Sequence, residues 1–151
     1  MIVITGPPRS GKNFILDIYK ECDVTTAVID AEHPLEGRPS VVKCAKFKRI
    51  IDSDRSIDQV FIMIRNIEDV VEDAIEAGIS RDRRALTKKI CARLGQIVYY
   101  CEMKDIDYET IHYPACLYQL EYLREKLDPG SDGIHTENFE QAWKRARRAR
   151  V

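Results

Sequence analysis

The sequence predicts a three-layer α/β fold in which a parallel sheet of four to five strands is flanked by helices. Apolar runs rich in β-branched residues, typical of buried parallel strands, alternate with segments that have the apolar periodicity of helices. Strands that alternate with helices in this way are joined by right-handed crossovers, which keep the strands parallel. The length of 151 residues corresponds to one domain, and neither a repeat nor a linker divides the chain. Residues 1–151 are therefore expected to form a single domain.

Five segments are expected to form the strands. Three are continuous apolar runs, one alternates apolar and polar residues, and one is a minor strand or extended segment. In chain order they are residues 1–5, 25–30, 40–44 (the minor one), 59–64 and 107–112. A loop with two prolines and a glycine follows the second strand at residues 31–40.

Six segments are expected to form helices. In chain order they are residues 12–21, 47–54, 67–77, 81–104, 114–127 and 137–150. Gly78 is a natural end for the third helix, Ser80 is expected as the N-cap of the fourth, and Pro114 opens the fifth. The Asp128-Pro129-Gly130 segment is expected to stop that fifth helix.

Composition and charge exclude several classes of protein. With 44% hydrophobic and 32% charged residues the chain is neither disordered nor fibrous, and its net charge of -1 disfavours a globally basic nucleic-acid binder. The five cysteines form no C-x-x-C pair and no metal-ligand spacing with histidine, so reduced thiols and no metal site are expected. No apolar run is long enough to span a bilayer and no targeting signal is visible, which predicts a cytoplasmic protein without membrane contact.

The segment from Gly6 to Lys12 (GPPRSGK) carries the clearest functional signal. It follows the first strand and opens the first helix, which is the context that a G-x-x-x-x-G-K phosphate-binding loop requires. Backbone N–H groups in such a loop form a concave anion site at the positive end of a helix, and the lysine adds a charge. Within this segment Pro8, Arg9, Ser10 and Gly11 are the other expected binding residues.

Two positions depart from the pattern of a magnesium-dependent nucleotide triphosphatase. Asn13 stands where a Ser or Thr hydroxyl would ligate magnesium, and Arg65 follows the 59–64 strand where a metal-binding carboxylate is expected. Both departures favour binding of an anionic nucleotide without magnesium. Asp30, at the end of the second strand, is the remaining candidate carboxylate and leaves a kinase that uses ATP and magnesium as an alternative.

Three segments in order resemble the P-loop family of sulfotransferases. Residues 8–13 (PRSGKN) match the first four positions of the family's P-[KR]-S-G-T-[TS] loop, and residues 65–73 (RNIEDVVED) follow the register of its R-[ND]-P-x-D-[VA]-x-x-S segment. Residues 108–114 (YETIHYP) and the helix after them are similar to the family's third conserved block. The resemblance implies a P-loop fold and metal-independent transfer from 3'-phosphoadenylyl sulfate, with adenosine 3',5'-bisphosphate as its product.

The resemblance also implies roles for individual residues. The loop and Lys12 would hold the 5'-phosphosulfate, Arg9 would neutralise the leaving bridge, and Arg65 would hold the 3'-phosphate. Asp73 occupies the position of the family's phosphate-binding serine, and Ala45 that of its histidine base. A replacement base is expected at Glu32 or His33, just beyond the carboxyl end of the second strand.

The substitutions at Asn13, Ala45 and Asp73 leave a further alternative open, namely a nucleotide-binding module without catalysis. Arg81, Arg83 and Arg84 are read as a solvated face or a lid that closes on phosphates. The basic run from Lys144 to Arg150 is a helix terminus, a phosphate clamp or a weak nucleic-acid patch. The acceptor is not encoded in any motif, and a second copy of the chain or another partner could complete its site.

Overall fold

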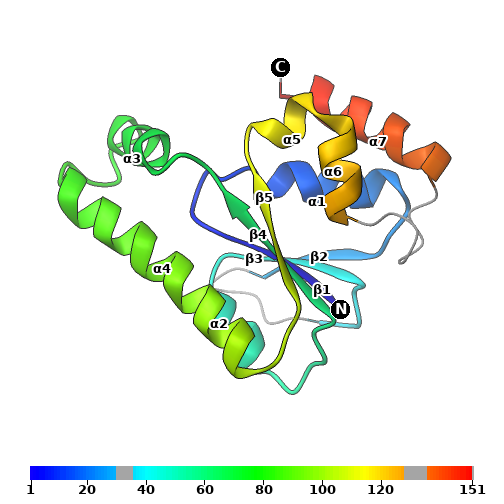
Figure 1. Cartoon of the computed structure of the whole chain (residues 1–151), viewed down its shortest axis with the longest axis horizontal. Helices are drawn as coiled ribbons and strands as arrows, with labels where there is room; N and C mark the ends of the chain where they lie inside the picture. The colour runs from blue at the N-terminus through cyan, green and yellow to red at the C-terminus, as the bar shows by residue number, and fades with distance from the viewer. Residues whose placement is uncertain (30–35, 128–135, 151) are drawn as a thin grey trace.

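A five-stranded parallel sheet forms the centre of the protein (Figure 1). The computed structural model describes residues 1–29, 36–127 and 136–150. Across the sheet the strands are β2 (Thr26–Ile29), β3 (Val41–Cys44), β1 (Ile2–Thr5), β4 (Gln59–Ile64) and β5 (Tyr108–His112). The sheet, its parallel pairing and its flanking helices confirm the predicted α/β class.

The central strand β1 is paired on both edges. Ile2 lies opposite Val41 of β3 and Gln59 of β4, and the pairing continues in register along both neighbours. Side chains of a strand alternate between the two faces of its sheet, and here Ile4 enters the core on one face while Val3 enters the core on the other. All four residues of β1 are buried, as expected for a strand covered by helices on both sides.

One face of the sheet is covered by four helices. They are α1 (Lys12–Glu21), α5 (Ala115–Tyr118), α6 (Leu120–Leu127) and α7 (Thr136–Arg148). Phe14 of α1 and Phe139 of α7 are fully buried in the core between them. The indole Nε1 of Trp143 donates a hydrogen bond of 2.8 Å to the Cys116 carbonyl oxygen, which ties α7 to α5.

The other face is covered by α2 (Phe47–Ile51) and the second half of α4 (Arg83–Met103), whose Ile97 and Cys101 are buried against the sheet. The first half of α4 extends away from the sheet and packs on α3 (Ile67–Glu76), as Figure 1 shows. We call α3 and this first half of α4 the α3–α4 arm. No helix among the described ranges is both long and apolar enough to cross a membrane.

Three expectations about the elements were wrong. Residues 40–44 do not form a minor strand, because β3 pairs with both β1 and β2 inside the sheet. The fourth helix is capped by Asp82, whose carboxylate accepts from the Ala85 N–H at 2.9 Å, whereas the Ser80 hydroxyl accepts from the Asp82 N–H. The expected helix over 114–127 is broken at Gln119, which has an extended backbone. The segment expected to stop that helix lies outside the described residues.

Gly6 couples the end of β1 to β4. Its φ of 138° lies in a region that favours glycine, and a methyl group there would lie 2.5 Å from the carbonyl oxygen of Met63. The neighbouring strand backbone therefore leaves no room for a side chain at this position. Gly78 also has a positive φ, of 71°, but nothing lies within 4 Å of its missing side chain.

This difference predicts the effects of two alanine substitutions on stability. Gly6→Ala adds a backbone clash to the conformational strain and should lower the free energy of unfolding by about 2–4 kcal/mol. Gly78→Ala carries the strain alone and should cost about 1 kcal/mol. Urea denaturation followed by circular dichroism measures both values, and equal losses in the two variants would contradict the proposed close contact.

Candidate functional site

The loop between β1 and α1 curls tightly over the carboxyl end of the sheet. Gly6, Arg9 and Gly11 all have positive φ, and the buried hydroxyl of Ser10 donates a hydrogen bond of 2.8 Å to the Pro7 carbonyl oxygen. Ser10 therefore holds the loop together from inside. The Ser10 hydroxyl thus has its hydrogen-bond partner within the loop.

The loop ends at the N-terminus of α1 without a capping side chain. Gly11 is the N-cap and supplies no side-chain acceptor, and the first turn of α1 contains no acidic residue. The positive end of the helix dipole and its unpaired N–H groups are thus left without an anionic partner from the helix itself. This arrangement favours an anion at the loop.

Lys12 projects its side chain back into the loop. Its Nζ donates to the carbonyl oxygen of Gly6 at 3.1 Å and to that of Pro7. Burial, and then the nearby charges of Arg93 and Lys43, lower the pKa of Lys12 from 10.5 to about 8. Because the charged form is disfavoured in the folded state, this lysine makes the protein gain stability as pH rises from about 8 towards 10.5.

Lys43, at the end of β3, contacts the residue after Lys12. Its Nζ donates a hydrogen bond of 2.6 Å to Oδ1 of Asn13. The amide oxygen of Asn13 thus accepts from an ammonium at the helix position where a magnesium-ligating hydroxyl was expected.

Arg93 reaches the same site from α4. Its guanidinium donates to the Ala45 carbonyl oxygen at 2.5 Å, and it shares a pocket lining with Arg9. We call Arg9, Lys12, Lys43 and Arg93 the cationic cluster. In the described parts of the chain no carboxylate forms an ion pair with any of its members.

The strands on either side of β1 bring no carboxylate to this cluster. β3 is followed by Ala45, and β4 is followed by Arg65. No group of three or more His, Cys, Asp or Glu side chains that could hold a metal occurs within residues 1–29, 36–127 and 136–150. Asp30, Glu32 and His33 lie outside these ranges, so the structure does not place the alternative metal ligand or the expected base.

Arg65 is paired with Asp73. Its NH1 lies 2.5 Å from Oδ2 of Asp73 and 3.4 Å from the Arg9 carbonyl oxygen, and its guanidinium stacks over the Tyr113 ring at 5.9 Å. Tyr113 packs so closely on Gly11 that no side chain fits there. Arg65 and Asp73 are thus brought together at the loop, and the carboxylate already neutralises the cation that was expected to bind a 3'-phosphate.

Arg93 was not predicted as a site residue. It lies ten positions into a helix whose exposed face carries many cations, so its sequence context resembles that of Lys88 or Lys89. Arg93 comes close to the loop only because α4 packs where its guanidinium can reach the Ala45 carbonyl oxygen after β3. Lys43 was not predicted as a site residue either, because its contact with Asn13 depends on the pairing of β3 with β1.

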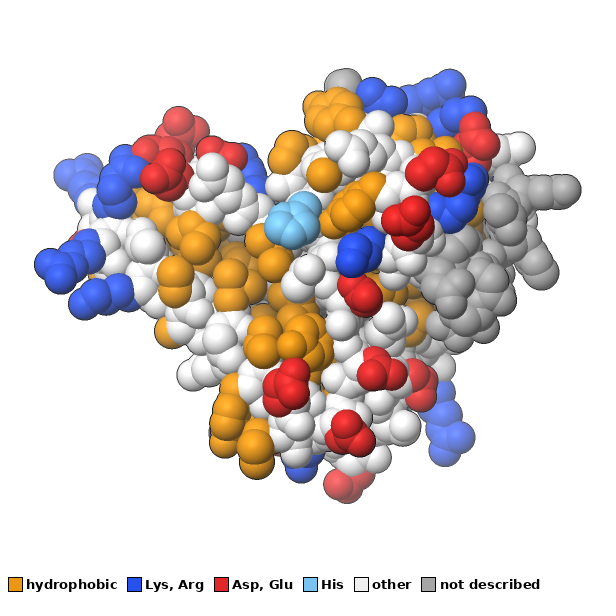
Figure 2. Space-filling view, in the orientation of Figure 1, with side chains coloured by type: hydrophobic (Ala, Val, Ile, Leu, Met, Phe, Trp, Pro, Cys, Tyr) orange, Lys and Arg blue, Asp and Glu red, His pale blue; other side chains and the backbone are white. Residues whose placement is uncertain are grey.

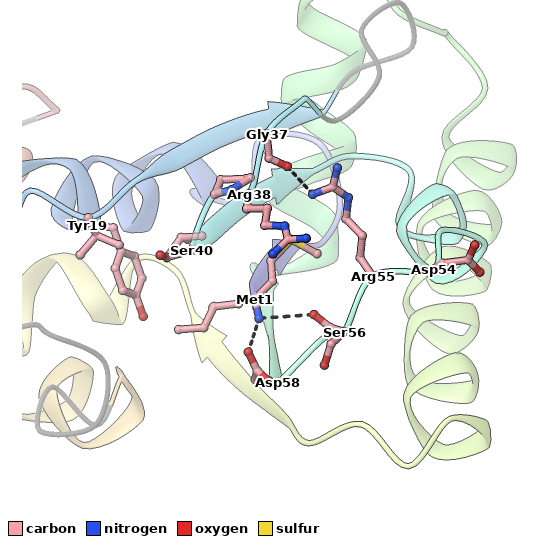
Figure 3. A pocket seen from close by; sticks show the side chains of 13 residues that line it. Met1, Tyr19, Gly37, Arg38, Ser40, Asp54, Arg55, Ser56 and Asp58 are labelled. Carbon is pink, nitrogen blue, oxygen red and sulfur yellow. Dashed lines mark hydrogen bonds and ion pairs between the residues drawn. The ribbon is translucent and has the colours of Figure 1, made fainter.

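A cavity of about 870 Å³ lies at the opposite, amino edge of the sheet (Figure 3). The α-amino group of Met1 pairs there with Asp58 and donates to the Ser56 carbonyl oxygen at 3.4 Å, while Arg55 donates to the Gly37 carbonyl oxygen. Charges of both signs line this cavity, and the loop with its cationic cluster is not part of it. Ligands of open parallel sheets bind at the carboxyl edge, so we place the candidate site at the loop.

Several cations of the two basic segments singled out by the sequence pair within the protein. In α7, Arg145 pairs with Glu21 of α1 and Arg150, just after the helix, with Asp17, while the Arg147 guanidinium lies over the Trp143 ring. Arg83 pairs with Glu72 across the α3–α4 arm. In Figure 2, Lys and Arg side chains are visible over the α3–α4 arm and in the region of α7. The pairings favour the structural explanation for both segments.

No family model and no curated protein matches this chain.

The lowered pKa of Lys12 predicts how anion binding depends on pH. An anion at the loop favours the charged ammonium, so affinity for inorganic sulfate, which stays a dianion in this range, should fall about tenfold between pH 7 and pH 9 as the free lysine loses its proton. Calorimetric titration at several pH values measures this fall. In Lys12→Arg the side chain stays charged, so the same pH range should leave the affinity unchanged; an equal fall in that variant would assign the effect to another group.

Proposed function

We propose that this protein binds the phosphate chain of a nucleotide at its 6–12 loop without magnesium and acts as a sulfotransferase-like group-transfer enzyme. The observation that carries the proposal is the contact between Lys43 and Asn13. An ammonium thus contacts the side chain at position 13, where a triphosphatase would present a magnesium-ligating hydroxyl. The residues that follow β3 and β4 also support binding without magnesium, because neither Ala45 nor Arg65 is a carboxylate that could hold the water shell of the metal.

Electrostatic balance gives a physical reason for anion binding. Four cations from three parts of the fold surround one loop, and no described carboxylate pairs with them. Like charges repel and burial further disfavours them, as the lowered pKa of Lys12 reflects. An anionic ligand would relieve both penalties at once.

The proposed chemistry is sulfuryl transfer from 3'-phosphoadenylyl sulfate. The acceptor oxygen forms a bond to sulfur as the bond from sulfur to the bridging oxygen breaks, and adenosine 3',5'-bisphosphate leaves with the electron pair. The acceptor proton passes to a base, for which Glu32 and His33 remain the candidates. Lys12, Arg9 and Lys43 would stabilise the charge that develops on the bridge and on the sulfuryl oxygens, which is the main requirement of such a transfer.

The Arg65–Asp73 pair favours a second candidate. A 3'-phosphate would have to displace the Asp73 carboxylate from Arg65, since the two side chains are already in contact. A donor without a 3'-phosphate avoids this competition. A kinase that uses ATP therefore remains the second candidate, with Asp30 as its possible metal ligand.

Isothermal titration separates the two candidates. Adenosine 3',5'-bisphosphate should bind in the presence of EDTA, and added magnesium should change its affinity by less than about twofold, because Asn13 supplies no hydroxyl for the metal and its amide oxygen already accepts from Lys43. Lys43→Met should weaken this binding about tenfold, whereas Lys104→Met, at the far end of α4, should not. Tight ATP binding that requires magnesium would instead establish the kinase and overturn the first proposal.

Replacement of Asp73 tests the 3'-phosphate contact by itself. Asp73→Ser frees the Arg65 guanidinium and should raise affinity for adenosine 3',5'-bisphosphate about tenfold. Affinity for adenosine 5'-phosphate should stay unchanged in the same variant. Asp69→Ser removes an equal charge from an exposed position of α3 and serves as the control. If both nucleotides gain equally, Arg65 does not contact the 3'-phosphate.

A further inference from the structure

A second pocket lies beside the cationic cluster. It lies between the 6–12 loop and the α3–α4 arm and has a volume of about 400 Å³. Val70 and Ala74 of α3 and Leu86 and Ile90 of α4 line it, together with Ile79, which has 63% of its surface exposed. Figure 2 shows apolar side chains gathered where the arm meets the sheet. The walls of this pocket are thus aliphatic.

The lining of the pocket also includes three cations. Arg9 of the loop and Lys89 and Arg93 of α4 line it, and no Asp or Glu side chain is among its described lining residues. None of these three cations forms an ion pair within the described ranges. The pocket therefore combines an aliphatic interior with unpaired positive charge on the side nearest the loop.

Size and polarity limit what this pocket can hold. A volume near 400 Å³ is that of a small-molecule site, not of a surface that docks a folded partner. A nucleobase is a poor match, because its polar edge would face aliphatic walls with only the Gln96 amide as an uncharged side-chain partner. A ligand with an apolar body and one anionic group matches both the aliphatic side chains and the three cations of the lining.

We propose that the α3–α4 pocket binds an amphiphilic anion, with its ring or alkyl body against Val70, Leu86 and Ile90 and its charge at Arg9, Lys89 and Arg93. Two of these cations also belong to the cluster at the loop, so the ligand lies next to any group bound there. A role for this ligand as the acceptor rests on the proposed function. The binding of the ligand does not.

A pair of fluorescent probes tests the two features separately. Anilinonaphthalene sulfonate carries an aromatic body and one anionic group, and phenylnaphthylamine has the same rings without the charge. The sulfonate should bind the folded protein with one-to-one stoichiometry and about fivefold more tightly than the neutral probe. Equal affinity of the two probes would contradict the proposed binding of the anionic group by Arg9, Lys89 and Arg93.

Substitutions on α4 assign the probes to the pocket. Ala92 lines the pocket from an exposed position, so Ala92→Phe should block it and weaken both probes at least about tenfold. Lys89→Gln should weaken only the sulfonate, by about twofold, because Arg9 and Arg93 remain. Cys91→Phe and Lys88→Gln make matched changes at exposed positions outside the lining and should leave both probes unaffected.

If Ala92→Phe does not fold, Ile79→Asp replaces it. That substitution puts a carboxylate at an exposed wall position and should weaken the sulfonate at least about tenfold. Unchanged sulfonate binding in the folded blocking variant would overturn the proposal.

Titration of the same variants with adenosine 3',5'-bisphosphate distinguishes this proposal from the proposed function. Ala92→Phe should retain nucleotide binding while it loses the probes. Failure of the nucleotide to bind the unmodified protein, with the probe pattern intact, would refute the proposed function and leave the pocket standing.

Discussion

The parallel pairing of β1 with a strand on each edge determines almost everything at the candidate site. Pairing with β3 brings Lys43 to Asn13, and pairing with β4 brings Arg65 and the Met63 carbonyl to the loop. Because all three strands run in the same direction, their carboxyl ends meet at one edge. The loop is thus built by three segments that lie far apart in the sequence.

This arrangement concentrates positive charge where water is partly excluded. The Lys12 ammonium rests on two carbonyl oxygens, and its lowered pKa shows that these contacts do not compensate for burial and for the neighbouring cations. Arg65 is the exception, since Asp73 balances it. Asp73 therefore neutralises Arg65, whereas no described carboxylate pairs with the four members of the cationic cluster. This difference is a physical reason for an anion to bind more tightly at the cluster than at Arg65.

Local patterns predicted much of the fold but little of the site's contacts. The bounds of α1 and β4 were predicted correctly from apolar periodicity and from the glycine turn before α1. The interior place of β3, between β2 and β1, could not be predicted, because strand order depends on pairing between distant segments and residues 40–44 carry only a short apolar signal. The approach of Arg93 depends on how α4 packs, because its hydrogen bond to the Ala45 carbonyl oxygen joins residues 48 positions apart in the sequence. The Arg65–Asp73 pair could have been anticipated from the eight-residue separation along a strand end and helix, where the two side chains can meet.

The separation of charge within the fold also bears on how quickly a ligand arrives. The protein as a whole carries a net charge of -1, which exerts almost no long-range pull on an anion. The cationic cluster nevertheless creates a positive potential that is confined to one edge of the sheet and decays within about 10 Å in ordinary salt. An approaching anion is therefore captured and turned only in the last step of its diffusion. Association at this edge depends on the orientation of the encounter, and increasing salt slows it by shortening the reach of that capture.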